Sequence, residues 1–184
     1  DKTAVDFLEQ MNVPAYKIAS FEITDIPLIE YIASKKKPVI IATGIATRKD
    51  IEEAINACIR MGNSKIVLLK CTSAYPAPFA EINLRMISKL RNDFGYVTGI
   101  SDHTVGTAVP IASVALGAKV IEKHFILDRR SGGLDAPFSL EPSEFKGMVV
   151  SVRNIEKALG KTRYFLSAKD KKNRELSRSL FVVQ

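Results

Sequence analysis

Five short runs of β-forming residues recur along the chain, and a helix-like segment separates each run from the next. The runs start 22 to 31 residues apart, the length of one strand followed by one helix and its turns. Strands that alternate regularly with helices form a parallel sheet with right-handed crossovers, so the spacing predicts an α/β fold. The predicted strands are Ala15–Ala19, Pro38–Thr43, Lys65–Cys71, Tyr96–Ile100 and Ala118–His124.

The segments between these runs have the apolar periodicity of helices that cover a sheet. In Arg48–Met61 the apolar residues share one face, with Thr47 placed to cap the first turn and Gly62 to end the helix. A further helix precedes the first strand, because the chain enters a helix-like segment directly after Asp1. The remaining predicted helices are Ile82–Phe94, Thr107–Leu116 and Glu141–Leu159.

An open doubly wound sheet and a (β/α)₈ barrel share this pattern, and periodicity alone does not choose between them. A barrel needs eight strands in about 250 residues. Five strands after a leading helix would therefore make the last five-eighths of a barrel. No Gly-x-Gly-x-x-Gly or Walker sequence follows any run, so the sequence gives no support to Gly-rich nucleotide binding.

The two histidines of the chain each stand at the end of a predicted strand. His103 follows the fourth strand and His124 closes the fifth. If these strands are neighbours, both imidazoles reach the carboxyl edge of the sheet, where α/β folds bind ligands. Two histidines with nearby carboxylates suit Mn²⁺ or Zn²⁺ and leave coordination positions open for catalysis. The alternative is that they are two unrelated polar residues.

Other polar residues gather at the same predicted edge. A lysine beside several Ser and Thr hydroxyls suits an oxyanion such as phosphate or carboxylate. Side chains alternate along a strand, so three pairs are each expected on one face. These pairs are Lys17 with Ala19, Ser101 with His103, and Glu122 with His124. Other interpretations remain open: Lys17 as a strand lysine reaching solvent, Glu122 as a partner of Lys17 or Lys123, and Tyr75 as loop packing.

Composition excludes several classes of protein. The formal charge is +7, but residues 161–178 carry seven basic and two acidic residues, so most of the excess lies in one terminal stretch. That stretch has no interleaved aromatics and no DNA-binding motif, which favours a solvated linker over nucleic-acid binding. Cys58 and Cys71 have neither metal-type spacing nor a disulfide framework, as in a reducing cytoplasm. Apolar stretches are strand-length, so no membrane span is expected.

Four motifs resemble the sialic acid synthase family. They are Pro14–Glu22 (PAYKIASFE), Lys70–Pro78 (KCTSAYPAP), Gly99–Thr104 (GISDHT) and Glu122–Phe125 (EKHF). Within the family the chain looks most like pseudaminic acid synthases, through Thr72–Pro78 and Phe138–Pro142. The resemblance runs over nearly all 184 residues. It implies a TIM barrel that condenses phosphoenolpyruvate with an N-acyl amino sugar and uses Mn²⁺ or Mg²⁺ as cofactor. Such an enzyme would be a cytoplasmic transferase in the biosynthesis of bacterial surface polysaccharides.

The resemblance also implies roles for individual residues. His103 and His124 would be the metal ligands. The phosphate and carboxylate of phosphoenolpyruvate would be held by Lys17, Ser20 and Ser101. The sugar and the reacting carbons would be faced by Glu22, Tyr75 and Asp135, and Thr43 and Ser73 would also contact substrate. The catalytic set would then be Glu22, His103, His124 and Asp135.

Two departures from the family pattern concern the substrate. Ala42 stands where neuraminic acid synthases tend to carry Ser, and Ser73 stands where they carry Asn. Ser73 argues for an acceptor other than N-acetylmannosamine, and we expect 2,4-diacetamido-2,4,6-trideoxy-altrose, which would give pseudaminic acid. The alternatives are an N-acetylneuraminate synthase, a non-catalytic barrel fragment, and a barrel aldolase with a Schiff-base lysine at Lys17, Lys70 or Lys123.

The ends of the chain carry expectations from the same resemblance. Residues 1–160 would be the C-terminal part of a TIM barrel, without the first three strands. Residues 161–184 would be a basic linker, including Ser177–Val183, toward an antifreeze-like (SAF) domain that reaches into the partner's active site in a homodimer. The 184-residue chain alone is accordingly expected to be inactive and to self-associate through its open edges.

Overall fold

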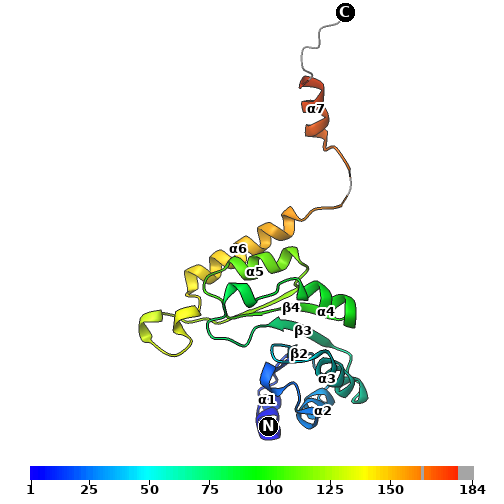
Figure 1. Cartoon of the computed structure of the whole chain (residues 1–184), viewed down its shortest axis with the longest axis vertical. Coiled ribbons are helices and arrows are strands. Elements are labelled where there is room, and N and C mark those ends of the chain that lie inside the picture. Colours follow the sequence, from blue (N-terminus) through cyan, green and yellow to red (C-terminus); the bar gives the residue numbers. More distant parts are fainter. Residues whose placement is uncertain (163, 178–184) are drawn as a thin grey trace, which may run out of the picture.

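The computed structural model describes residues 1–162 and 164–177, and its centre is a parallel sheet with helices packed against it (Figure 1). The strands follow one another in the order β1-β2-β3-β4-β5. Each lies within two residues of its predicted bounds, so the strand prediction is confirmed. The strands are β1 (Tyr16–Ile18), β2 (Val39–Ala42), β3 (Ile66–Cys71), β4 (Val97–Asp102) and β5 (Val120–Lys123).

The strand order and the exposure of the two faces identify an incomplete barrel. A doubly wound sheet reverses its order at a switch point and has helices on both faces, whereas this order is consecutive. Ile18, Ile41 and Leu68 are register partners and are fully buried on the helix-covered face. On the opposite face Val97 is 48% exposed. The helices therefore cover one face of the sheet, as in a barrel wall, although Ala42 and Leu69 on the other face are also buried.

An ion pair between the two outermost strands shows how strongly the sheet curls. The amine of Lys17 on β1 lies 3.4 Å from Oε1 of Glu122 on β5. In a flat sheet, four interstrand spacings of about 4.8 Å would hold these strands roughly 19 Å apart. Two side chains span that gap only if the uncovered face is concave. The prediction of an incomplete TIM barrel is thus confirmed.

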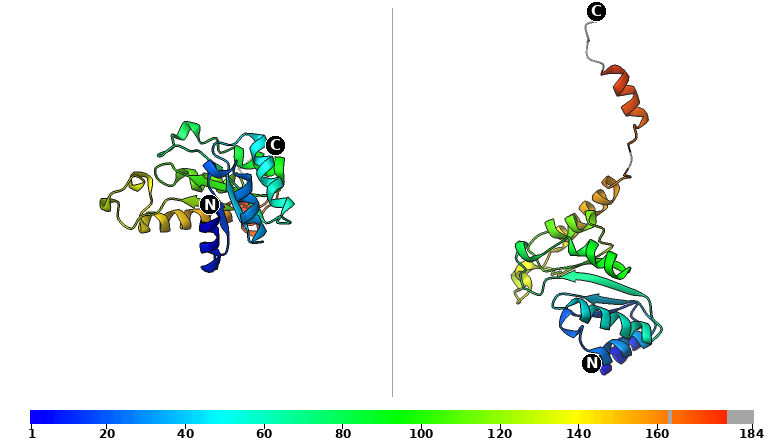
Figure 2. Two further views of the ribbon diagram at one scale, coloured as in Figure 1. Left: turned by 90° about the horizontal axis from the view of Figure 1, so that it is seen from below. Right: turned by 45° about the vertical axis from the view of Figure 1, so that its right-hand side comes forward.

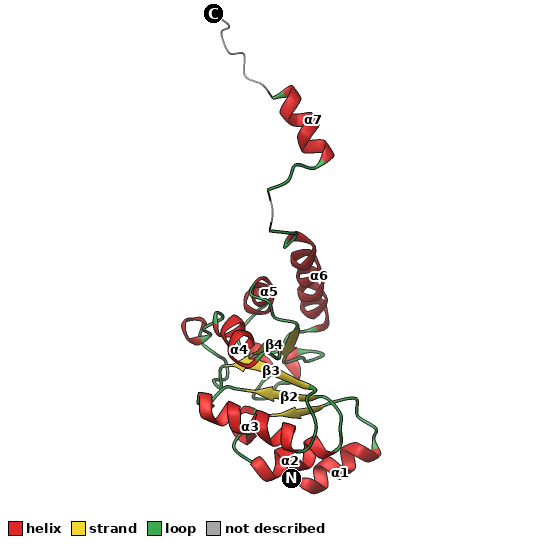
Figure 3. Cartoon of the chain, turned by 90° about the vertical axis from the view of Figure 1, so that its right-hand side faces the viewer, coloured by secondary structure: helices red, strands yellow, loops and turns green. Residues whose placement is uncertain are grey.

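The helices between the strands, together with the helix after the last strand, lie on the convex side of the sheet (Figure 3). Within this layer α2 packs against α3, and α5 packs against α6. Four short 3₁₀ turns lie in the loops: Ser20–Glu22, Phe79–Glu81, Arg129–Ser131 and Ala136–Phe138. The helices are α1 (Lys2–Gln10), α2 (Ile26–Ser34), α3 (Arg48–Arg60), α4 (Met86–Phe94), α5 (Ala108–Ala115), α6 (Pro142–Ala158) and α7 (Ala168–Leu176).

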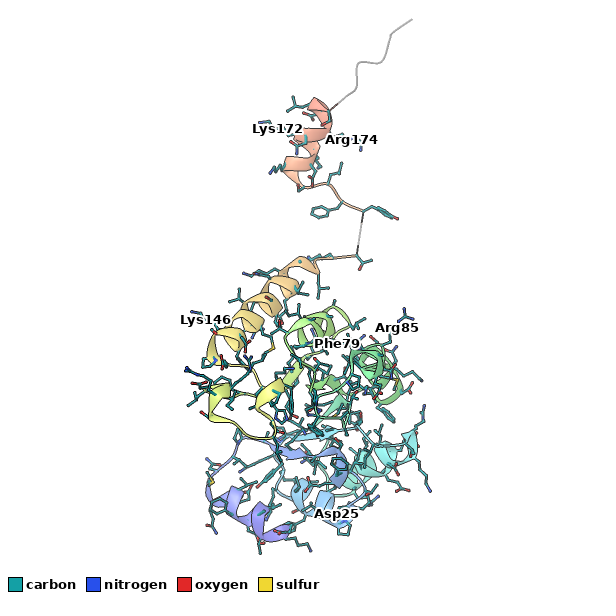
Figure 4. The ribbon with its side chains drawn as sticks, turned by 60° about the vertical axis from the view of Figure 1, so that its left-hand side comes forward. Asp25, Phe79, Arg85, Lys146, Lys172 and Arg174 are labelled. Atoms are coloured by element: carbon teal, nitrogen blue, oxygen red, sulfur yellow. The ribbon has the colours of Figure 1, made fainter. Side chains whose placement is uncertain are left out.

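Capping residues fix where the helices begin and end. The hydroxyl of Thr47 accepts the Asp50 N–H, and Gly62 adopts a φ of 66° just past the end of α3, both as predicted. Asp25, labelled in Figure 4, caps α2 by accepting the Leu28 N–H.

The prediction of a helix that begins at Ile82 was wrong, because α4 begins at Met86. Asn83 has a φ of 49°, which no helical residue adopts. Ile82 is nevertheless buried in the same apolar cluster as Ile87. The apolar periodicity therefore extended across a turn, and the predicted helix started too early.

The basic C-terminal stretch stands apart from the sheet. Helix α7 has no buried residue and extends beyond the end of α6 (Figure 2). Lys172 and Arg174 project from it, far from the strands (Figure 4). Of the linker Ser177–Val183 expected from the sequence, all but Ser177 lies outside the described residues. In the part of the chain that the structure describes, none of the helices is both long and apolar enough for a membrane span.

Candidate active site

The carboxyl ends of the five strands meet around a cavity of about 170 Å³ on the concave face. Because all five strands run in one direction, polar residues that follow different strands arrive at the same edge. Six of the ten residues predicted for the site line this cavity. The lining residues are Lys17, Ala19, Ser20, Phe21, Ala42, Cys71, Tyr75, Ser101, His103, Glu122 and His124.

The two imidazoles lie side by side in this cavity, with their ring centroids 5.2 Å apart. His103 is 5% exposed, and its Nδ1 donates to the Thr72 carbonyl oxygen at 2.9 Å. That bond requires a proton on Nδ1, so in the neutral ring Nε2 is a free acceptor. Nδ1 of His124 lies 3.3 Å from Oδ2 of Asp135. Both rings are therefore oriented through Nδ1 by an oxygen acceptor.

The surroundings shift the pKa values of the two histidines in opposite directions. Burial opposes the charged form of His103, but hydrogen bonds with Cys71 and Thr72 outweigh it and raise its pKa. Burial, and then the charge of His103, lower the pKa of His124. His124 is accordingly held in the neutral form that can donate a lone pair. Burial also raises the pKa of the Cys71 thiol, but hydrogen bonds with His103 and Ser20 overcome this and bring it to about 7.

Lys17 and Ser101 converge on the carboxylate of Glu122. The Lys17 amine lies 3.4 Å from Oε1, and the Ser101 hydroxyl donates to the same oxygen at 2.6 Å. The structure thus chooses Lys17 over Lys123 as the partner of Glu122. The Lys17 and Glu122 side chains are 32% and 42% exposed, so a ligand can reach both. An anion entering the cavity would compete with Glu122 for one cationic amine and one hydroxyl.

Two further hydroxyls meet at the edge of the cavity, from the turns that follow β1 and β3. Ser73 donates to Ser20 at 3.1 Å, and Ser20 lies 3.5 Å from the sulfur of Cys71. Gly44 follows β2 directly beneath them. A Cβ at Gly44 would lie 2.2 Å from the Ser73 oxygen and 2.9 Å from that of Ser20. The glycine therefore leaves the space in which the two hydroxyls meet.

An aromatic wall supports the imidazoles. The ring centroids of Tyr75 and His103 lie 4.3 Å apart, and those of Phe138 and His124 lie 4.9 Å apart. Phe138 is 1% exposed, whereas Tyr75 is 49% exposed at the mouth of the cavity. Tyr75 therefore belongs to the site as well as to its loop.

Besides Ser73, three predicted residues lie beside the cavity without lining it. The Glu22 carboxylate accepts the Ala19 N–H at 3.0 Å and so caps its own 3₁₀ turn. The Thr43 hydroxyl is buried and donates to the Leu69 carbonyl at 3.1 Å. Asp135 reaches the site through His124, with its side chain 57% exposed.

The sequence-based set missed Glu122, Cys71 and Phe138. Glu122 and Cys71 each stand two residues before a predicted site residue, His124 and Ser73. Strand alternation had placed Glu122 on one face with His124 without including it among the site residues, and the same signal could have included Cys71. Phe138 arrives from a loop after the last strand, and no local pattern places it there.

The histidine pair is the candidate site for a divalent cation. In residues 1–162 and 164–177, no cluster of three or more His, Cys, Asp or Glu side chains has metal-binding geometry. The pair itself fits, because each Nδ1 faces an oxygen acceptor, the arrangement that fixes metal-ligating imidazoles. Two protein ligands also leave positions open for substrate oxygens, as catalytic sites require.

Comparison with known proteins places this geometry in context. The NeuB family model matches residues 1–164. A pseudaminic acid synthase from Helicobacter pylori is 44% identical over 182 residues, covering 98% of this chain and 54% of that protein. A human N-acetylneuraminate-9-phosphate synthase is 38% identical over 182 residues, covering 98% of this chain and 50% of that protein. The chain thus spans about half the length of these relatives.

Solved structures agree. An N-acetylneuraminic acid synthetase from Leptospira borgpetersenii, crystallised with citrate, superimposes with a TM-score of 0.88 at 33% identity, covering 98% of this chain and 63% of that one. A truncated 3-deoxy-D-arabino-heptulosonate 7-phosphate synthase from Thermotoga maritima gives a TM-score of 0.70 at 18% identity, covering 80% and 60%, and shares the fold alone. Family model, sequence identity and fold agree, and the chain belongs to the NeuB family.

Proposed function

We propose that this chain serves in an enzyme that condenses phosphoenolpyruvate with an N-acyl amino sugar aldehyde to give a nonulosonic acid and phosphate. The observation that carries the proposal is the single cavity in which Lys17 and Ser101 face two oriented imidazoles. An anion site beside a cation site is what this pair of substrates requires. The names of the relatives support the same reaction class.

The residues of this chain have separate tasks in the proposed reaction. Lys17 and Ser101 hold the anionic groups of phosphoenolpyruvate, displacing Glu122 from them. A divalent cation, Mn²⁺ or Mg²⁺, bound by His103 and His124 would polarise the sugar aldehyde. Phe138 and Tyr75 hold the two rings in place, and Asp135 orients His124.

The bond changes then balance without a redox partner. C3 of phosphoenolpyruvate bonds to the aldehyde carbon, whose oxygen takes up a proton. Water adds at C2. As the bond from C2 to the phosphate oxygen breaks, the new C2 hydroxyl becomes a carbonyl and its proton leaves with the phosphate. Glu122, the carboxylate among the described residues that line the cavity, is placed to take the proton that the water releases.

Three features of the wider protein belong to this proposal. We place the reaction in the cytoplasm, because Cys58 and Cys71 are both free thiols. Residues 1–160 serve as barrel wall and 161–184 as a basic linker toward an SAF domain. The working form is a homodimer.

Phosphate release from phosphoenolpyruvate by the gene product that carries this chain tests the function. His124→Ala and Lys17→Met should each lower the rate at least about 100-fold, because each removes a charged or coordinating contact to substrate. Lys49→Met is the matched control, since Lys49 lies on the surface of α3 with its side chain 82% exposed. Full activity in Lys17→Met would refute the assignment of the anion site.

The acceptor is tested separately. Ser73 replaces the Asn of neuraminic-type enzymes, so kcat/KM should be higher for 2,4-diacetamido-2,4,6-trideoxy-altrose than for N-acetylmannosamine. Equal values for the two sugars would contradict the pseudaminic assignment. Borohydride should trap no covalent adduct, because Lys17 forms an ion pair with Glu122, and the amines of Lys70 and Lys123 donate hydrogen bonds to other groups.

A further inference from the structure

A buried ion pair joins the ends of β4 and β5 directly behind the cavity. The Lys123 amine donates to Oδ2 of Asp102 at 2.7 Å, and both side chains are 0% exposed. The same amine donates to the Thr104 carbonyl oxygen. Thr104 in turn donates its N–H to Oδ1 of Asp102 at 3.0 Å and its hydroxyl to Oδ2 at 3.1 Å. One amine and one carboxylate thus hold the strand end and the first turn after it.

The position of this pair relative to the site follows from strand alternation. Asp102 stands between Ser101 and His103, and Lys123 stands between Glu122 and His124. Those four neighbours line the cavity, while Asp102 and Lys123 point to the opposite, helix-covered face. Each partner of the pair therefore has a site residue on either side of it along the strand.

The pair is also the last connection between the two strands before the histidines. The β4–β5 register ends at Asp102 opposite Lys123. Beyond it, the His103 carbonyl accepts the Ala77 N–H and the His124 carbonyl accepts the Leu140 N–H. The backbone carbonyls of the two histidines thus accept hydrogen bonds from different segments of the chain.

We propose that Asp102 and Lys123 are positioning residues that set the separation and relative orientation of His103 and His124. The inference rests on the proposed function, because that function makes the two imidazoles a cation site. A buried ion pair adds little net stability over apolar side chains of similar volume. Its directional hydrogen bonds, however, allow one offset between the strand ends. Apolar side chains would fill the same space without fixing that offset.

Removal of both charges together tests this without leaving one charge buried and unpaired. In the gene product that carries this chain, Asp102→Leu combined with Lys123→Met should bind Mn²⁺ at least about tenfold more weakly, since the imidazoles lose their fixed separation. The probe is Mn²⁺ alone, titrated by electron paramagnetic resonance, so that turnover is not needed. The control is Glu30→Gln with Arg60→Met, which removes an exposed pair between α2 and α3. The control should bind Mn²⁺ within twofold of wild type.

The outcomes separate the positioning role from a structural one. A folded double variant that binds Mn²⁺ as tightly as wild type would overturn the inference, even if its melting temperature fell. If the double variant does not fold, Thr104→Val decides, because it removes one hydrogen bond to Asp102 and no charge. It should weaken Mn²⁺ binding at least threefold, and unchanged binding would overturn the inference. Wild-type protein that binds no Mn²⁺ would overturn the cation site of the proposed function and this inference together.

Discussion

Gly99 lies in the middle of β4, where the sheet leaves no room for a methyl group. An added Cβ would lie 2.1 Å from the Val120 carbonyl oxygen on β5 and 2.9 Å from Cδ2 of Leu69. The leucine can rotate, but the carbonyl belongs to the backbone of the neighbouring strand. A C···O contact normally measures about 3.3 Å, so Gly99→Ala would push the two strands apart by roughly 1.2 Å. Overpacking of this kind costs about 1–3 kcal/mol.

Gly147 provides the matched control for this substitution. It lies within α6, and a Cβ there would meet no atom within 4 Å. Because glycine is unfavourable inside a helix, Gly147→Ala should stabilise the chain by about 0.5–1 kcal/mol.

Urea unfolding and thermal unfolding measure both changes in the 184-residue chain. Gly99→Ala should lower the unfolding free energy, and the melting temperature should fall by about 2–4 °C for each kcal/mol lost. Gly147→Ala should raise both. Wild-type stability in Gly99→Ala would refute the reasoning, because it would mean that β4 and β5 do not approach each other at this position.

Three further predictions address pH, thiol reactivity and assembly. Hydrogen bonds from Tyr16 and Lys37 lower the pKa of Glu9. The stability that these bonds add is therefore complete above the unfolded pKa of about 4.3 and is lost as the pH falls through the folded pKa. The melting temperature of Glu9→Gln should accordingly lie below that of wild type at pH 7, and the two should become equal in acid. A difference that persists in acid would contradict this. Burial raises the pKa of the Cys58 thiol to about 11, so iodoacetamide at pH 8 should not alkylate Cys58 in the native chain. Mass spectrometry measures the alkylation, and rapid labelling would contradict the burial of Cys58 on α3. Because β1 and β5 are edges of the described sheet, light scattering of the 184-residue chain should show dimers or larger species without phosphate release, and an active monomer would contradict this.

Local features of the fold were predictable because they depend on neighbours in the chain. Thr47 and Gly62 mark the start and the end of α3 as expected, since a helix cap forms between residues only three or four positions apart in the chain. Alternation along single strands likewise brought Ser101 and His103 to the cavity together. The predicted start of α4 was wrong because apolar periodicity gives no information about a change of backbone direction such as that at Asn83.

The sequence by itself therefore determined which residues form strands and helices, apart from the start of α4, and most of the side chains at the carboxyl edge. Only the tertiary structure decided what those side chains contact. Lys17 and Glu122 belong to opposite edge strands, and their 3.4 Å contact exists because the sheet curls. The choice of Asp102 as the partner of Lys123 follows from the register of β4 and β5. Strand order, register and curvature are set by packing between segments far apart in the chain, and periods of two and 3.6 residues carry no information about them.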